Sequence, residues 1–232
     1  MSIIDVKNLN KSFKIGKTEN HVLKDINFKV EKGEFLSIMG PSGGGKSTLL
    51  YLLGGLYKPT SGSVSIDNID ISTIKEKQMS KLRRNKIGFV FQFYNLVPNL
   101  SVEDNIMLPL MLDGKKLKNY NDKLDEILDI IDMKDKRKLT PRELSGGQQQ
   151  RVAIARALIF EPEIIFLDEP IGNLDSKTGT EIMKLFKKIN VEYGKTLIQV
   201  THSKESATYG TAIINLIDGQ IINRVELNER VG

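Results

Sequence analysis

The sequence predicts an α/β domain: a mostly parallel sheet flanked by helices, with an antiparallel β-layer near the N-terminus and an inserted α-helical lobe. Three observations predict this class. Short, nearly all-apolar runs alternate with helical patterns, as in parallel sheets whose strands are covered on both faces. The early strands alternate polar and apolar residues, which is typical of an antiparallel layer with one solvated face. Between Gln92 and Pro162 the patterns are almost only helical.

The expected elements follow one another without a repeat or a linker. Strands are expected at 3–8, 25–30, 34–40, 62–67, 87–92, 163–169, 196–201, 212–217 and 220–227. Helices are expected after Gly45, Lys75, Ser101, Tyr120, Ser145, Asp175 and Ser203. Residues 1–232 are therefore expected to form a single domain, in which 1–92 and 162–232 make the α/β core and 93–161 is the inserted helical subdomain.

The composition is that of an ordinary soluble globular protein. The 232 residues are 40% hydrophobic and 27% charged, with a formal net charge of +5. A solvated surface accounts for this charge, and the basic run 75–86 has the spacing of an exposed helix face, so no nucleic-acid partner is expected. The absence of Cys excludes a disulfide framework and a Cys-based metal site or nucleophile. Neither a signal peptide nor a membrane span is expected, because the apolar runs are too short.

Residues 40–47, GPSGGGKS, match the phosphate-binding pattern G-x-x-x-x-G-K-[ST] at every fixed position. The pattern follows an apolar strand and opens a helix, the context that makes the core a P-loop NTPase. Lys46 is expected to reach the β- and γ-phosphates of ATP, Ser47 to ligate Mg²⁺, and Thr48 to add a hydroxyl contact to the phosphates. The backbone that cradles the phosphates is expected to be that of Gly40, Pro41, Ser42, Gly43, Gly44 and Gly45.

Four polar residues stand where apolar strands end, at the edge where open α/β sheets bind their ligands. Asp168 is predicted to support Mg²⁺, and Glu169 to polarise the attacking water. A strand-terminating turn is the alternative for this pair. His202 is predicted to contact the γ-phosphate and the water. Gln92 is predicted to ligate Mg²⁺ or water and to report the position of the helical lobe. For His202 and Gln92 an ordinary surface position is the alternative.

A second glycine-rich helix start, LSGGQ at 144–148, precedes an apolar stripe. Two glycines leave bare backbone N–H groups at a helix N-terminus, where the helix dipole favours an anion. With these motifs in order, the sequence resembles the ATP-binding subunit of an ABC transporter over essentially the whole chain. LSGGQ matches the signature motif of that family, and NLDS at 173–176 matches its D-loop.

The resemblance implies a head-to-tail homodimer that ATP closes, in which each ATP lies between the phosphate loop of one chain and the signature of the other. It implies that Phe13 stacks on adenine, with a core Phe as the alternative, and that Asp175 communicates across the dimer. The signature residues that would complete the γ-phosphate shell of the partner's ATP are Ser145, Gly146, Gly147 and Gln148.

The resemblance also implies an integral membrane permease as partner, contacted through Phe93–Pro98, and a cytoplasmic chain peripheral to the inner face of the membrane. Local packing within the lobe is the alternative for this apolar-aromatic segment. The stretch 89–110 is similar to the group of lipoprotein-release, macrolide-export, bacitracin- and antimicrobial-peptide-resistance and cell-division ATPases. The short stretch after the last expected strand disfavours the sugar-importer group, which carries a long C-terminal regulatory domain.

An ATPase that powers export or removal of antimicrobial peptides, drugs or lipoproteins is the leading hypothesis. Two alternatives stay open: a cell-division type ATPase that signals to a membrane partner without transport, and a soluble ABC ATPase acting on ribosomes or DNA. Three positions depart from the family pattern. Gly44 stands where Ser is frequent, Ile171 where this group usually has Thr, and Ser203 where Asp is common.

Overall fold

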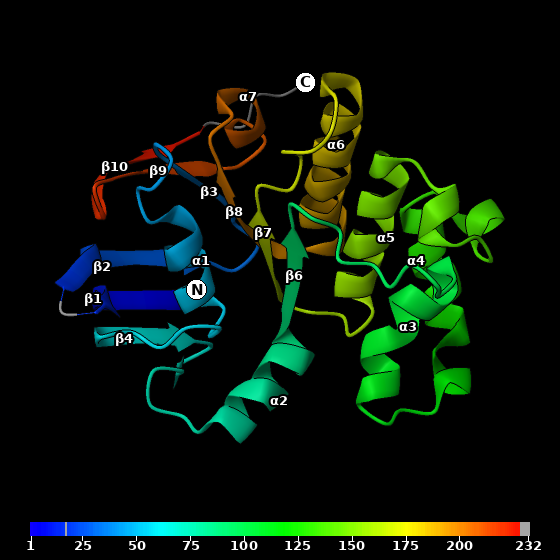
Figure 1. Ribbon diagram of the computed structural model, residues 1–232, viewed down its shortest axis with the longest axis horizontal. Coiled ribbons are helices and arrows are strands. Elements are labelled where there is room, and N and C mark those ends of the chain that lie inside the picture. The colour runs from blue at the N-terminus through cyan, green and yellow to red at the C-terminus, as the bar shows by residue number, and fades with distance from the viewer. Residues whose placement is uncertain (17, 228–232) are drawn as a thin grey trace.

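The computed structural model describes residues 1–16 and 18–227, in which strands and helices alternate along the chain (Figure 1). The strands are β1 (Ser2–Ile15), β2 (Thr18–Glu31), β3 (Phe35–Met39), β4 (Ser61–Ile66), β5 (Ile69–Asp70), β6 (Ile87–Phe91), β7 (Ile164–Asp168), β8 (Thr196–Thr201), β9 (Ala212–Ile217) and β10 (Gln220–Glu226). The α-helices are α1 (Lys46–Leu53), α2 (Glu76–Lys86), α3 (Val102–Leu112), α4 (Asn121–Ile130), α5 (Gly146–Leu158), α6 (Ser176–Tyr193) and α7 (Lys204–Ala207). Short 3-10 helices are η1 (Leu117–Tyr120), η2 (Lys134–Lys136) and η3 (Pro141–Glu143).

The central sheet has the strand order β10-β9-β3-β8-β7-β6. Pairing is parallel from β9 to β6, and the edge strand β10 is antiparallel to β9. Parallel strands end at the same edge, so the carboxyl ends of β3, β8, β7 and β6 lie side by side. The register shows this directly: Met39 pairs with Thr201, and Asp168 pairs with both Val200 and Phe91.

A second, antiparallel sheet has the order β2-β1-β4-β5, which confirms the predicted N-terminal layer. The β1–β2 hairpin is longer than the expected strands 3–8 and 25–30. Its outer part is held by backbone pairing, for example Phe13 with Asn20, while β2 is exposed from Thr18 to His21. A strand segment that buries no side chain has no apolar alternation, so its sequence could not reveal it.

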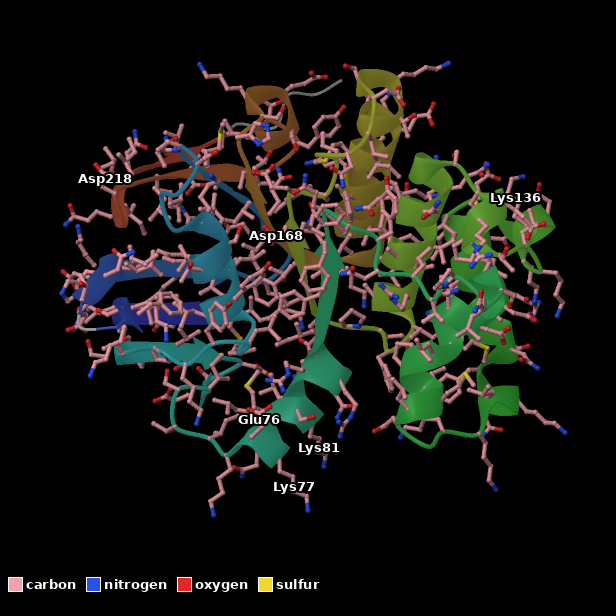
Figure 2. The ribbon with its side chains drawn as sticks, in the orientation of Figure 1. Glu76, Lys77, Lys81, Lys136, Asp168 and Asp218 are labelled. Carbon is pink, nitrogen blue, oxygen red and sulfur yellow. The ribbon has the colours of Figure 1, made fainter. Side chains whose placement is uncertain are left out.

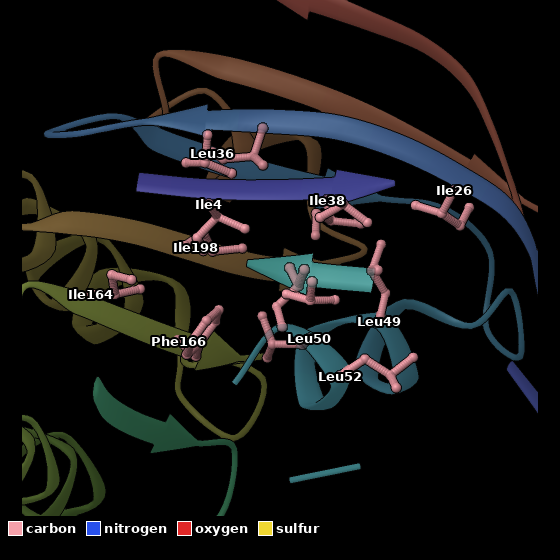
Figure 3. Close-up of a cluster of buried hydrophobic side chains, with 14 of the residues drawn as sticks. Ile4, Ile26, Leu36, Ile38, Leu49, Leu50, Leu52, Ile164, Phe166 and Ile198 are labelled. Atoms are coloured by element: carbon pink, nitrogen blue, oxygen red, sulfur yellow. The ribbon is translucent and has the colours of Figure 1, made fainter. Parts of the chain in front are cut away.

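Two apolar cores cover the two faces of the central sheet. The first lies between the sheets around α1, where Ile4 of β1, Ile38 of β3 and Leu50 of α1 gather in one cluster (Figure 3). The second lies between the opposite face and the helices α3 to α6. In β7, Phe166 belongs to the first core and Leu167 to the second. The prediction that this strand is covered on both faces is therefore confirmed.

The helical segment enters after β6 and returns to the sheet at β7, as the pattern between Gln92 and Pro162 predicts (Figure 1). The apolar stripe of α5 is buried, with Val152 and Leu158 in the second core. The basic run 75–86 forms α2, whose buried residue is Met79, while Lys77 and Lys81 point away from the body (Figure 2). Among the described residues, no helix combines the length and the apolar character that crossing a membrane requires.

Truncation of Phe166 to Ala tests the first core. This ring is 0% exposed and stacks on Phe89 with the ring centroids 5.2 Å apart. We expect Phe166→Ala to lower the free energy of unfolding by about 3–5 kcal/mol, because a cavity replaces a buried ring. Urea unfolding followed by circular dichroism measures the change. Phe93→Ala is the control, since Phe93 is 68% exposed, and its effect should stay within about 0.5 kcal/mol. Equal losses in the two variants would contradict this packing.

Candidate nucleotide-binding site

The loop at 40–45 joins the carboxyl end of β3 to the start of α1, and two of its positions require glycine. Gly45 has a φ of +93°, and a Cβ there would lie 2.9 Å from Cδ2 of Leu23. A Cβ on Gly40 would lie 1.9 Å from the carbonyl oxygen of Leu216. The loop therefore packs tightly on its neighbours, while its residues 41–43 are exposed beside a helix N-terminus, the arrangement that binds phosphate.

Lys46 lies under this loop. Its side chain is almost buried, and Nζ donates to the carbonyl oxygens of Gly40 at 2.9 Å and Pro41 at 3.0 Å. Within residues 1–16 and 18–227, no carboxylate forms an ion pair with it. A positive charge that carbonyl dipoles hold but no anion neutralises is suited to attract a phosphate. Thr48, two residues later in α1, is half-buried.

Ser47 and Asp168 meet beside the loop, although they are far apart in the chain. The Ser47 hydroxyl donates to Oδ1 of Asp168 at 2.9 Å, and the Tyr51 hydroxyl donates to Oδ2 at 2.5 Å. Burial, together with the Asp168 carboxylate, raises the pKa of Tyr51, so its hydroxyl remains a donor. Figure 2 shows Asp168 near the middle of the molecule.

The donor set at this point fits a magnesium ion. A serine hydroxyl and a carboxylate are the hard oxygen ligands that Mg²⁺ prefers. In the described part of the chain, no group of three or more His, Cys, Asp or Glu side chains is placed to hold a metal by itself.

Glu169 and His202 lie together one residue beyond the ends of β7 and β8. Nδ1 of His202 is 3.1 Å from both carboxylate oxygens of Glu169. The Glu169 side chain is 19% exposed and that of His202 is 70% exposed, so the pair lies between the core and solvent. Glu169 has a φ of +47°, an unfavourable conformation for a residue with a Cβ, of the kind that collects at functional sites. A carboxylate in this place can accept a proton from a water molecule.

Gln92 follows β6 at the same edge and is bound to the D-loop. Its Nε2 donates to Oδ1 of Asn173 at 3.0 Å, and Nδ2 of Asn173 donates to the carbonyl oxygen of Gln92 at 3.1 Å. The side-chain oxygen of Gln92, the atom that would ligate Mg²⁺, takes no part in these two bonds. The amide therefore joins the start of the helical segment to residues 173–176.

The LSGGQ segment forms the start of α5 with a capping box. Oε1 of Gln148 accepts from the backbone N–H of Ser145 at 3.0 Å, and Oγ of Ser145 caps the helix. A Cβ on Gly146 would lie 2.8 Å from Oη of Tyr94, and one on Gly147 would lie 2.3 Å from Cγ2 of Thr178. Both glycines thus allow a close approach of these two side chains to the start of α5.

The two glycine-rich helix starts do not lie together in one chain. Figure 1 shows α1 and α5 on opposite sides of β6 and β7. The sheet order agrees, because α1 follows β3, and β8 and β7 separate β3 from the edge strand β6, which α5 contacts. A phosphate bound to the loop at 40–47 is therefore separated from the signature of the same chain by the strands β7 and β6.

Phe13 and Asp175 lie at the surface of the molecule. The Phe13 ring is half-buried, makes an edge contact with Tyr57 at a centroid distance of 5.8 Å, and has Nζ of Lys11 4.7 Å from its centroid. Asp175 is exposed and caps α6 by accepting from the Thr178 N–H at 3.0 Å. Hydrogen bonds from Thr178 lower the pKa of the Asp175 carboxyl.

Two of the positions that depart from the family pattern have visible structural roles. Ser203 caps α7, since its Oγ accepts from the Ser206 N–H at 3.1 Å. Ile171 packs against the second core.

Residues that the sequence did not single out also join the site. Tyr51 is one: the spacing of four from Ser47 on a helix is the signal that could have revealed it. Gln150 is another: it is fully buried, and its Nε2 donates to the carbonyl oxygen of Pro170 at 2.6 Å. Its Oε1 is a buried atom with no hydrogen-bond partner among the described residues. No local pattern reveals Gln150, because its partner lies in a distant loop.

Alanine substitutions in the loop test its close packing. Gly43 and Gly45 both have positive φ, but a Cβ on Gly43 meets nothing within 4 Å, whereas a Cβ on Gly45 meets Leu23 and Val22. We expect Gly45→Ala to lower the free energy of unfolding by about 1–3 kcal/mol more than Gly43→Ala does, because the backbone strain is shared and the clash is not. Urea unfolding without nucleotide measures both. A loss in Gly43→Ala that equals the loss in Gly45→Ala would contradict the close approach.

Known proteins share this architecture. The family model described as ABC transporter matches residues 23–172. The ABC transporter ATP-binding protein MJ0796 of Methanocaldococcus jannaschii is 47% identical over 223 residues, covering 94% of this chain and 95% of the relative. The lipoprotein-releasing system ATP-binding protein LolD 1 of Chlorobium chlorochromatii is 40% identical, covering 95% of this chain and 90% of the relative. The macrolide export ATP-binding/permease protein MacB of Neisseria meningitidis serogroup B is 42% identical, covering 100% of this chain and 36% of the relative.

A solved structure agrees with these sequences. The dimeric structure of the ATP-binding cassette MJ0796 in a post-hydrolysis state, bound to ADP and Pi, matches with a TM-score of 0.88 and 44% identity, covering 97% of this chain and 99% of that chain. The family match spans most of the chain and includes the loop at 40–47, the strand end at Asp168 and the signature. The chain therefore belongs to the ABC transporter family, as an ATP-binding subunit that hydrolyses ATP.

Proposed function

We propose that this ATPase closes as a head-to-tail homodimer around two ATP and drives a separately encoded membrane permease that exports or removes antimicrobial peptides, drugs or lipoproteins. The observation that carries the proposal is the meeting of four strand ends at one edge of the central sheet. The loop after β3, the Asp168–Glu169 pair after β7, His202 after β8 and Gln92 after β6 lie side by side there.

Each group at this edge has a chemical task in hydrolysis. The loop N–H groups and Lys46 bind the phosphates of ATP. Ser47, Asp168 and Gln92 would hold Mg²⁺, which neutralises phosphate charge when it is bound. Glu169 orients a water molecule and accepts its proton as the bond to the γ-phosphate breaks, releasing ADP and phosphate. His202, in contact with both Glu169 oxygens, keeps that carboxylate in place and contacts the γ-phosphate.

The separation of the phosphate loop from the signature within one chain supports a dimer. The N–H groups of Gly146 and Gly147 lie at the start of a helix of 13 residues, a position that favours an anion. A phosphate bound to the loop at 40–47 of the same chain does not reach them, so the anion would come from a second chain. In a two-fold dimer, the loop of one chain faces the signature of the other, and two equal sites form. The relative MJ0796 has been solved as a dimer. Asp175, which is exposed next to α6, is suited to contact the second chain.

The segment Phe93–Pro98 has the features of a docking site for the permease. Phe93 is 68% exposed and Val97 is 37% exposed, while the backbone beneath them is held firmly. Arg156 of α5 donates to the carbonyl oxygens of Tyr94 and Asn95 at 2.8 and 2.7 Å. Leu96 packs on the second core, so local packing involves one side of the segment and leaves Phe93 for a partner.

The same segment is coupled to the signature helix. The Tyr94 hydroxyl lies against Gly146 at the start of α5, while Arg156 near the end of that helix holds the Tyr94 carbonyl. A displacement of the segment 93–98 would therefore be transmitted to α5 at two points, near its start and near its end. We propose that residues 93–161 move as a subdomain relative to the α/β core formed by 1–92 and 162–232. Within that core, residues 17 and 228–232 lie outside the described residues. The names of the relatives, a lipoprotein-releasing system ATP-binding protein and a macrolide export ATP-binding/permease protein, favour a membrane partner. The chain would then act at the cytoplasmic face of the cell membrane.

Removal of the Glu169 charge tests the catalytic part of the proposal. We expect Glu169→Gln to lower ATP hydrolysis at least about 100-fold, because the amide cannot accept the proton of the attacking water. ATP binding should persist, and the variant should elute as a dimer when ATP is present. Phosphate release and size-exclusion chromatography with light scattering measure these outcomes. Glu192→Gln, an exposed change of the same chemistry at the end of α6, should hydrolyse ATP normally. Brisk turnover by the Glu169 variant would refute its role.

A charge on the exposed aromatic residue tests the docking segment. We expect Phe93→Asp to abolish co-purification with the proposed membrane permease, because a carboxylate would be desolvated in an apolar contact. Leu112→Asp is the matched control: Leu112 is 82% exposed at the end of α3, outside the segment. Circular dichroism checks that both variants fold. Retention of the membrane partner by Phe93→Asp, or its loss in both variants, would argue against docking at this segment.

A further inference from the structure

Two residues of one helix hold the two oxygens of the Asp168 carboxylate. Ser47 and Tyr51 are four positions apart in α1, so their side chains lie on the same face. Ser47 donates to Oδ1 and Tyr51 to Oδ2, across sequence separations of 121 and 117 residues. A carboxylate with one donor can still turn about its last torsion, whereas donors on both oxygens set its plane.

The Tyr51 ring is itself held by two other rings. It makes edge contacts with Tyr57 at a centroid distance of 5.5 Å and with Phe91 at 6.5 Å. Phe91 pairs with Asp168 in the sheet register. The Tyr51 ring therefore packs against the strand next to β7, and β7 carries Asp168, the acceptor of the Tyr51 hydroxyl. Aromatic contacts of this kind have preferred geometry, so they restrain how the ring is placed. The hydroxyl is therefore presented to Oδ2 by a rigid support.

The two donors, Ser47 and Tyr51, differ in their expected role when a metal is bound. Ser47 is the residue that would ligate Mg²⁺, and its hydroxyl oxygen would then serve the metal with a lone pair while its O–H group remains a donor to Asp168. Tyr51 has no such second task in the described site. Its hydroxyl donates to Oδ2 alone, so it restrains the carboxylate independently of Ser47, which donates to Oδ1.

We infer that Tyr51 is a positioning residue for the divalent cation, acting through the Asp168 carboxylate. The inference rests on the proposed role of Asp168 in holding Mg²⁺. Partners of metal-holding carboxylates tune metal affinity without touching the metal, and losing such a partner typically weakens binding about 10–100-fold. Since the ring remains in Tyr51→Phe, the substitution removes one hydroxyl and keeps the packing.

The experiment measures Mn²⁺ binding to the ADP-saturated chain by the electron paramagnetic resonance signal of free Mn²⁺. We expect Tyr51→Phe to bind Mn²⁺ about 10-fold more weakly than the unsubstituted chain. Tyr57→Phe, which removes a hydroxyl from the neighbouring ring, should bind Mn²⁺ within about twofold, as expected of a change that leaves both Asp168 donors in place. The ADP affinity in EDTA should not change in Tyr51→Phe, because a positioning role affects only the metal, and circular dichroism checks that the variant is folded at the temperature of the measurement.

Asp168→Asn, measured in the same way, separates the inference from the function on which it rests. If Asp168→Asn loses Mn²⁺ affinity and Tyr51→Phe does not, the role of Tyr51 is refuted and the metal assignment stands. If Asp168→Asn binds Mn²⁺ normally, the assignment of Asp168 fails and the inference fails with it. A fall in metal-free ADP affinity that equals the fall in Mn²⁺ affinity would make Tyr51 a structural residue only, which also overturns the inference.

Discussion

The parallel pairing of β3, β8, β7 and β6 is the constraint on which the site depends. Strands that run in one direction end at one edge, and these four come from parts of the chain that are up to about 160 residues apart. Their register places Thr201 beside Met39, and Phe91 beside Asp168. The backbone hydrogen bonds of the sheet therefore place the residues that follow these strand ends close together, independently of any contact between their side chains.

The packing of both sheet faces makes this edge firm. Alternate residues of β7 enter different cores, so the strand that carries Asp168 is held from two sides. Below His202, a buried polar network anchors α7 to the sheet. Nε2 of Gln199 donates to Oγ of Ser37 at 2.7 Å and to the carbonyl oxygen of Ser206 at 2.9 Å, while Oγ of Ser206 donates to Oε1 of Gln199. A buried amide whose groups are all satisfied fixes its neighbours.

The helical segment packs on the sheet through the second core and also reaches the site through polar contacts. Gln150 joins α5 to Pro170, which follows the Glu169 turn, and Gln92 joins β6 to Asn173. The Gln150 bond joins the helical segment to the α/β core, whereas Gln92 and Asn173 both belong to the core. Among the described residues, Oε1 of Gln150 is a buried atom with no hydrogen-bond partner. Apolar packing and a buried amide bond therefore both join the signature helix to the strands that carry the site.

The sequence by itself determined the phosphate loop, the strand-end residues and the order of the elements, because each depends on neighbours within a few positions. The loop at 40–47 requires particular residues at fixed spacing, and the helix starts at Ser101, Ser145 and Asp175 carry their own capping side chains. Local periodicity predicted buried strands correctly and missed the outer β1–β2 hairpin, which buries too little to show a pattern.

Only the tertiary structure decided which side chains meet across the molecule. The bond from Tyr51 to Asp168, the contact of Tyr94 with Gly146 and the bond from Gln150 to Pro170 all join separate elements. Their formation depends on how sheets and helices pack, and a side chain's own neighbours in the sequence hold no information about that. Short motifs in the sequence therefore predict the chemistry of this ATPase. The side chains that position these motifs and join one motif to another can be identified only in the folded structure.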